Sequence, residues 1–170
     1  MSFLDLAKER YSCRKLTAKK IEPEKIERIL QAGIAAPTAK NGQAYKIWKF
    51  ATPDAMEKIK AVTNFTFGAE FALLVGGLPE KSFDRPFDKF NFGQVDGAIV
   101  ATHLMLAIQD EGLATTWVGY FDAPKLKEMF PEMKDYDLIA IFPIGYPTED
   151  AVPSPRHTQR REISDAVTEI

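Results

Sequence analysis

Two arginines and a serine alternate near the N-terminus, at Arg10, Ser12 and Arg14. In an extended segment alternate side chains point the same way, so these three residues would face one ligand together. The planar guanidinium fork suits a phosphate, and the serine hydroxyl adds a compact donor beside it. The segment alone does not separate an anion site from a solvated surface loop, because many loops carry such residues.

A second loop with binding chemistry spans residues 36–43, with the sequence Ala-Pro-Thr-Ala-Lys-Asn-Gly-Gln. Gly42 and the small side chains around it would let the main chain approach a polar ligand closely. The same composition is also common in ordinary turns. The composition of this loop therefore does not by itself distinguish a ligand-binding loop from an ordinary turn.

Several catalytic devices are missing from the sequence. It contains no Gly-x-Gly-x-x-Gly, no Walker loop, and no Cys or His cluster with the spacing of metal ligands. Of its two histidines, His103 falls in an apolar helical stretch, where we expect a hydrogen-bonded packing role, and His157 falls in the tail. Cys13 is interpreted as a bystander thiol. If this protein is an enzyme, it would therefore supply a binding site, and a cofactor would supply the chemical reactivity.

Length and composition predict one globular domain. The chain has 170 residues, a formal charge of −2 and no long run of basic residues, so neither several domains nor a nucleic-acid partner is expected. A single cysteine excludes an intrachain disulfide and fits a reducing compartment. The sequence shows no signal peptide and no apolar stretch of membrane-spanning length. We therefore expect a soluble cytoplasmic protein without a membrane partner.

Hydrophobic periodicity predicts alternating helices and strands. The uninterrupted apolar run at 71–78 is expected at the centre of a sheet. The stretch 93–111 is apolar on nearly every turn, so it is expected to form a buried helix, either at the centre of the domain or at a dimer interface. The predicted helices span residues 2–9, 23–36, 53–62, 93–111 and 123–130, and the predicted strands span 46–51, 71–78, 114–121 and 138–145.

Two other segments suggest contacts with something else. Residues 79–92 place four phenylalanines among charged side chains, which fits either a surface loop packed on the body or a lid or subunit contact over a flat aromatic ligand. The segment 148–170 begins with prolines and carries arginines. It ends with Ile163, Val167 and Ile170, so we expect an extended arm that docks on a second subunit.

Four separated stretches together resemble the FMN-dependent nitroreductase family. Their order and spacing fit the family over essentially the whole chain, although no single stretch is specific. The stretches are Arg10-x-Ser12-x-Arg14, Ala36-Pro37-Thr38-x-x-Asn41-x-Gln43, Trp117-Val118-Gly119-Tyr120-Phe121, and Gly145-Tyr146-Pro147 followed by Arg160-Arg161.

The resemblance implies an α+β, nitroreductase-like fold, in which helices flank a mostly antiparallel sheet. It also implies an intertwined homodimer with two FMN sites at the subunit interface. Residues 1–147 would form the FMN-binding core of the domain. Residues 148–170 would form its C-terminal arm, which is exchanged onto the partner.

The resemblance also implies which residues bind the cofactor. Arg10, Ser12 and Arg14 would meet the phosphate, the ribityl chain and the pyrimidine edge of FMN. The backbone near Gly119 and Tyr120 would face the flavin N5. The other implied residues are Pro37, Thr38, Asn41 and Gln43 from the partner subunit, Trp117 and Val118 near the ring, and Arg160, with Arg161 as the second choice, at the phosphate.

The function implied by the resemblance is that of an NAD(P)H oxidoreductase. NAD(P)H would deliver hydride to FMN, and a nitroaromatic, quinone or similar flat acceptor would then take two electrons in the same place (a ping-pong reaction). No metal and no protein acid or base is needed. Two other classes remain open. One is a non-catalytic FMN carrier or sensor. The other is a phosphate- or nucleic-acid-binding module with salt-dependent binding and no bound chromophore.

Overall fold

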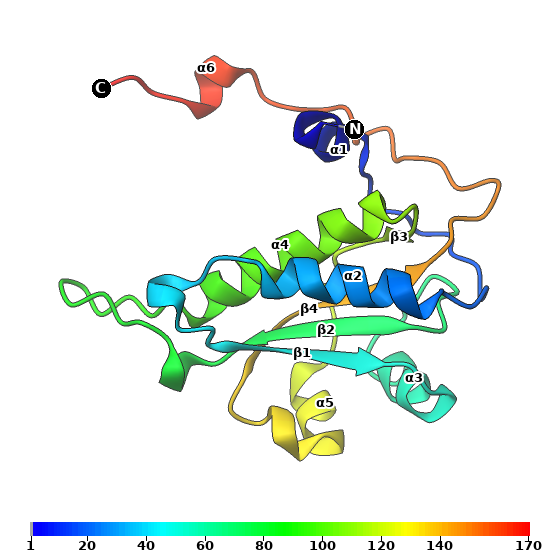
Figure 1. Ribbon diagram of the computed structural model, residues 1–170, viewed down its shortest axis with the longest axis horizontal. Coiled ribbons are helices and arrows are strands. Elements are labelled where there is room, and N and C mark those ends of the chain that lie inside the picture. The colour runs from blue at the N-terminus through cyan, green and yellow to red at the C-terminus, as the bar shows by residue number, and fades with distance from the viewer. Residues whose placement is uncertain (1) are drawn as a thin grey trace.

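A four-stranded antiparallel sheet in the order β1-β2-β4-β3 forms the centre of the computed structural model, which describes residues 2–170 (Figure 1). Helices cover both faces of this sheet, with α2 and α4 on one side and α3 and α5 on the other (Figure 1). The strands are β1 (Tyr45–Phe50), β2 (Ala72–Gly77), β3 (Ala114–Thr115) and β4 (Asp137–Gly145). The helices are α1 (Phe3–Glu9), α2 (Pro23–Ile34), α3 (Pro53–Lys60), α4 (Gly93–Asp110), α5 (Ala123–Met129) and α6 (Ile163–Ala166), with short 3₁₀ turns at Ala39–Asn41, Pro79–Lys81 and Pro131–Met133.

Strand β2 is buried on both faces, which explains its uninterrupted apolar sequence. Leu73 and Val75 pack into the cluster under α2 and α4, whereas Ala72 and Leu74 pack into the cluster over α3 and α5. Burying a leucine side chain fully stabilises the fold by roughly 1.5–3 kcal/mol. The central position predicted for the run 71–78 is confirmed.

The sequence also marks where several helices begin. The hydroxyl of Thr52 accepts a hydrogen bond from the Ala55 amide at the start of α3 (3.2 Å). The carboxylate of Asp122 accepts one from the Lys125 amide at the start of α5 (3.0 Å). Threonine and aspartate are common at helix starts, because such side chains satisfy amides that have no partner inside the helix.

Helix α4 crosses the sheet closely, as expected of a central helix, but one of its sides is not buried within the single chain. Its faces toward α2 and the sheet are apolar, yet Thr102 is exposed and Leu106 is half-buried, so one side stays open. A Cβ added at Gly77 would lie 1.9 Å from the Gly93 carbonyl, so only glycine permits this approach. The Nδ1 of His103 lies 2.9 Å from the Ile99 carbonyl, which confirms its packing role.

The strand predicted at 114–121 is shorter than expected. Strand β3 pairs with β4 only at Ala114 and Thr115, and Val118 forms a separate bridge to Ile141. Between them, the hydroxyl of Thr115 donates to the Pro143 carbonyl (2.7 Å). Proline has no N–H to offer a neighbouring strand, so the regular ladder is interrupted here.

The C-terminal segment leaves the body of the molecule after β4. Figure 1 shows it passing α1 and ending beyond it, with α6 near its tip. Ile163 and Val167 are exposed, at 80% and 63%. No helix within residues 2–170 is both long enough and apolar enough to cross a lipid bilayer.

Candidate functional site

Two cationic segments that are far apart in the sequence line one cavity of about 400 Å³. Its volume falls in the ~300–1,000 Å³ range of typical ligand sites. The predicted residues Arg10, Ser12 and Arg14 all line it. The remaining lining residues are Tyr11, Ser154, Arg156, His157 and Arg160.

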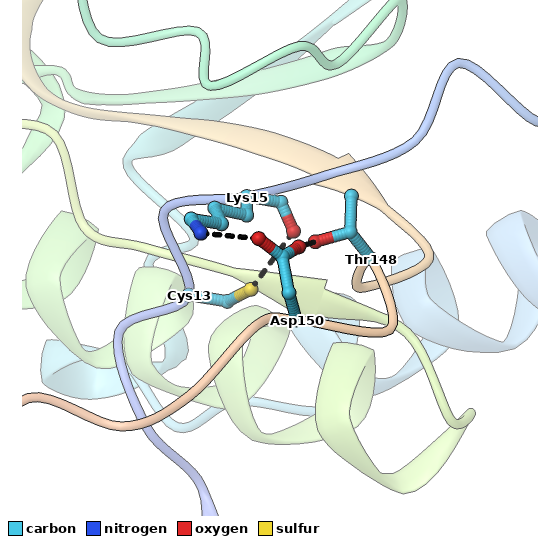
Figure 2. Close-up of polar contacts among 4 residues, drawn as sticks. All are labelled: Cys13, Lys15, Thr148 and Asp150. Atoms are coloured by element: carbon cyan, nitrogen blue, oxygen red, sulfur yellow. Dashed lines mark hydrogen bonds and ion pairs between the residues drawn. The ribbon is translucent and has the colours of Figure 1, made fainter.

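Backbone pairing between the two segments brings the cations together. Leu16 and Pro147 form an antiparallel bridge, and the Thr148 amide donates to the Lys15 carbonyl (3.1 Å). Figure 2 shows Asp150 paired with the Lys15 ammonium at 2.5 Å and accepting a bond from the Thr148 hydroxyl at 2.6 Å. These contacts hold the beginning of the tail against the N-terminal segment, so its arginines follow alongside Arg10.

Cys13 lies on the other side of the same extended segment. Its side chain is fully buried, and its thiol donates to the Lys15 carbonyl at 3.3 Å (Figure 2). A buried, hydrogen-bonded thiol of this kind packs rather than reacts. The alternation that buries Cys13 is the one that turns the neighbouring arginines toward the cavity.

The cavity carries positive charge that no acidic side chain balances. Within residues 2–170, none of its arginines forms an ion pair with a carboxylate. Burial of the Arg10 guanidinium, and secondarily the nearby charge of Arg160, lower the pKa of Arg10. Both effects mean that an anion in the cavity would relieve an unfavourable interaction. The arrangement fits a phosphate group.

A second cavity of about 190 Å³ shares Arg14 with the first. Several of its lining side chains are aromatic. Phe65 and Phe67 stack with centroids 5.8 Å apart, and Tyr120 meets Phe65 edge-on at 5.9 Å. The cavity is also lined by Thr116, Trp117, Val118 and Gly119. Arg14 therefore joins a cationic compartment to an aromatic one.

The backbone beside the aromatic cavity offers donors. Both backbone groups of Val118 are paired with Ile141 (3.0 Å each), so they are not available to a ligand. The hydroxyl of Thr63 donates to the Tyr120 carbonyl (2.8 Å) and fixes this turn. In the part of the chain that the structure describes, the Gly119 and Tyr120 amides donate to no protein acceptor. They can meet an acceptor atom of a ligand.

The other predicted loop lies elsewhere. Residues 37–43 follow the C-terminal end of α2, whereas the segment 10–20 runs toward its N-terminal end (Figure 1). Pro37, Thr38, Asn41 and Gln43 line neither of the cavities that contain Arg14.

Two further observations concern the tail and an aromatic loop. Arg160 lines the cationic cavity, but Arg161 does not, and its Nη1 lies 3.5 Å from the Asp165 carbonyl. Sequence reasoning also missed Phe65 and Phe67, although two aromatic residues just before Gly68 give a local signal.

Comparison with known proteins decides the family. The Nitroreductase family model matches residues 7–67 and 63–146. The chain belongs to the nitroreductase family. This assignment makes the protein an oxidoreductase and confirms the resemblance drawn from the sequence.

Solved structures agree with this family assignment. A nitroreductase family protein from Clostridium difficile is 33% identical, with a TM-score of 0.91 over 99% of this chain and 98% of that one. A putative nitroreductase from Exiguobacterium sibiricum, solved in complex with FMN, is 18% identical with a TM-score of 0.83, over 100% of this chain and 98% of that one. These likenesses confirm the predicted α+β nitroreductase fold.

A curated sequence relative is named a putative NADH dehydrogenase/NAD(P)H nitroreductase and comes from Archaeoglobus fulgidus. It is 27% identical over 83% of each chain. A second relative, an NADPH-dependent oxidoreductase from Staphylococcus haemolyticus, is 24% identical over 89% of this chain and 68% of its own length.

Proposed function

We propose that this nitroreductase binds FMN and transfers two electrons from NAD(P)H to a nitroaromatic, a quinone or a similar flat acceptor. The observation that carries the proposal is the pair of cavities joined at Arg14. One has unbalanced cations for a phosphate, and the other has aromatic walls and backbone donors for a planar ring.

The cationic cavity would hold the phosphate of FMN. Arg10 and Arg160 would neutralise it through charge-assisted hydrogen bonds, which are roughly twice as strong as neutral ones. Ser12 would add a hydroxyl donor toward the ribityl chain. Arg156 and His157 line the same cavity and would strengthen its positive potential.

The aromatic cavity would hold the ring. Arg14 would lie at the pyrimidine edge, where a cation favours the reduced, anionic form of a flavin. The free amide of Gly119 or Tyr120 would donate toward N5, while Trp117 and Val118 border the approach. When bound, FMN would supply the redox chemistry, accepting hydride from the nicotinamide and passing two electrons to the acceptor. No side chain is required as an acid or a base.

The complete site would need a second copy of the chain. Pro37, Thr38, Asn41 and Gln43 would reach the flavin of the partner subunit, which accounts for their distance from the cavities of their own chain (Figure 1). Residues 148–170 would form the C-terminal arm on the core 1–147. Because residues 154–160 line the cavity of their own chain, the part of the arm beyond Arg160 would be the part that is exchanged onto the partner. Support comes from the apolar side chains left exposed on α1, α2 and α6, namely Phe3, Leu4, Ile34 and Ile163.

Relatives support the cofactor and the electron donor. The structure from Exiguobacterium sibiricum with the same fold is a complex with FMN. Two curated relatives carry NAD(P)H or NADPH in their names. These names leave the choice between NADH and NADPH to experiment.

The visible spectrum of the purified protein, before and after anaerobic addition of NADPH or NADH, tests this proposal. We expect an oxidised-flavin band that NAD(P)H bleaches and a nitroaromatic or quinone restores. A flavin band that neither nicotinamide bleaches would instead indicate an FMN carrier or sensor. A colourless protein that takes up no added FMN would contradict the proposal as a whole.

A further inference from the structure

A buried carboxylate outside the two cavities holds together two segments that the sequence analysis treated separately. Asp96, in the first turn of α4, is only 1% exposed. One of its oxygens accepts a hydrogen bond from the Ala39 amide (2.8 Å), and the other accepts one from the Ser82 hydroxyl (3.2 Å). A buried carboxylate is tolerated because these donors and the helix N-terminus compensate its charge.

The first segment that Asp96 holds is the loop 38–43. Three of its non-glycine residues, Lys40, Asn41 and Gln43, adopt left-handed backbone conformations with φ of 53°, 54° and 49°. Such conformations are unfavourable for these residues and persist only where the surroundings enforce them. The Gln43 amide donates to the Thr38 hydroxyl (3.0 Å), so the loop is closed on itself as well as tied to Asp96.

The second segment is a hairpin formed by residues 82–92. Asp84 and Asn91 form an antiparallel bridge, and the Asn91 side-chain amide donates to the Asp84 carboxylate (2.8 Å). Near the tip, Arg85 and Asp88 form a bidentate ion pair. Phe87 lies between them and is 95% exposed. The hairpin therefore presents a large apolar side chain on a well-bonded frame.

The two segments also touch directly. The ammonium of Lys40 lies 4.2 Å from the centroid of Phe83, at the base of the hairpin. Phe83 in turn packs on Phe92, with centroids 5.7 Å apart. Figure 1 shows the loop after α2 and the hairpin before α4 at the same end of the sheet. Loop and hairpin thus form one body with Asp96 at its centre.

We propose that Asp96 is a positioning residue that couples the loop 38–43 to the hairpin 82–92, so that both act on the partner's site as one unit. This inference rests on the proposed function, in which that loop reaches the partner's flavin. The loop would bind the cofactor. The hairpin, carried with it, would bring Phe87 over the acceptor and make it a determinant of selectivity for flat aromatic acceptors.

Three variants distinguish the contact of Asp96 with the loop from its contact with the hairpin. Ser82→Ala removes only the bond to the hairpin, so we expect the KM for a quinone to rise about fivefold while the Kd for FMN is unchanged. Asp96→Ala releases both segments, so the Kd and the KM should each rise about tenfold. Asp96→Asn keeps a side-chain oxygen for the Ala39 amide, so it should restore the Kd to within about twofold of wild type.

Controls distinguish positioning from a purely structural role. Asp54→Asn changes an exposed acid in the first turn of α3 and should alter neither constant. Phe87→Ala should reproduce the effect of Ser82→Ala on the quinone. Hexacyanoferrate, an acceptor without a flat ring, should show an unchanged KM in both variants. Kd and KM are measured well below each variant's unfolding temperature.

The outcomes separate this inference from the function on which it rests. A wild-type protein that binds no FMN overturns the proposed function. Wild-type binding and turnover, together with an Asp96→Ala variant whose Kd and KM stay within twofold, overturn the coupling alone. In that case a lower unfolding temperature would leave Asp96 only a structural role.

Discussion

The arginine-lined cavity and the loop 38–43 are both fixed by hydrogen bonds within one chain, but only the first lies at a cavity of its own chain that contains Arg14. The cavity brings together residues 10–14 and 154–160 of the same chain, and backbone pairing at Leu16 and Pro147 closes it. The loop is held by the hydrogen bond from the Ala39 amide to Asp96, yet it lines neither cavity that contains Arg14. Under the proposed function, the cationic half of the flavin site folds with each subunit, and the other half is delivered by the partner.

The largest effect on FMN binding is expected from a substitution in the cationic half of the site. Arg10→Ala removes a charge-assisted bond to the phosphate, worth about 1.5–3 kcal/mol. The Kd for FMN should therefore rise roughly 10- to 100-fold in a fluorescence titration. Arg161→Ala is the matched control, because Arg161 lies outside the cavity, and it should bind nearly as wild type does. If Arg161→Ala weakened FMN binding as much as Arg10→Ala does, Arg161 would also contact the phosphate, which would contradict the assignment of this role to Arg160.

A smaller effect is expected where the two cavities meet. Arg14→Ala should weaken FMN binding about tenfold and lower the flavin potential, because a cation beside the ring favours reduction. Its neighbour Cys13 faces the core. Cys13→Ala should therefore change neither quantity, even if it lowers stability. The checks are a flavin-release titration and a spectroelectrochemical potential. Equal behaviour of the two variants would refute the role assigned to Arg14.

The unbalanced charge gives a prediction for the protein without cofactor. Inorganic phosphate at about ten times its Kd should stabilise the fold by about 1.4 kcal/mol and raise the unfolding temperature by roughly 3–6 °C, because it binds only the folded state. Although the pKa of Arg10 is lowered, an arginine keeps its proton at neutral pH, so its charge remains available. Thermal unfolding of Arg10→Ala in the same buffers is the control. An undiminished phosphate effect in that variant would place the anion elsewhere.

The smallest effect should come from the contact that Figure 2 shows between Lys15 and Asp150. Both side chains are more than half exposed, at 56% and 69%, and exposed pairs contribute only about 0.2–1 kcal/mol. Asp150→Asn should change the Kd for FMN less than threefold, because the backbone pairing of the segment remains. A loss as large as that of Arg10→Ala would mean that this pair, and not the backbone bridge, holds the tail in place.

The parts of this picture that were predictable from the sequence are local. Alternation in an extended segment was enough to place Arg10, Ser12 and Arg14 on one side and leave Cys13 on the other. The apolar run at 71–78 was enough to mark a central strand, because a strand covered on both faces has no polar side. Caps such as Thr52 and Asp122 act within a single turn of the chain.

The parts that were not predictable depend on contacts between distant residues. Nothing near His157 shows that the tail turns back beside Tyr11, since the pairing of Leu16 with Pro147 decides it. The bonding of Asp96 has no local signal either, because its two partners, Ala39 and Ser82, lie 57 and 14 residues away along the chain. The strand at 114–121 was overestimated because its sequence does not reveal the interruption opposite Pro143.

A complementation experiment tests the division of the site most directly. One chain carries Arg10→Glu, which spoils its own cationic half, and the other carries Asn41→Ala with Gln43→Ala, which spoil only the loop. Each variant alone is expected to bind FMN poorly. In the mixed dimer, the intact cavity of the second chain would meet the intact loop of the first. The account predicts that FMN binding returns at one site per mixed dimer. A mixed dimer that binds no better than its parents would show that each site is built from a single chain.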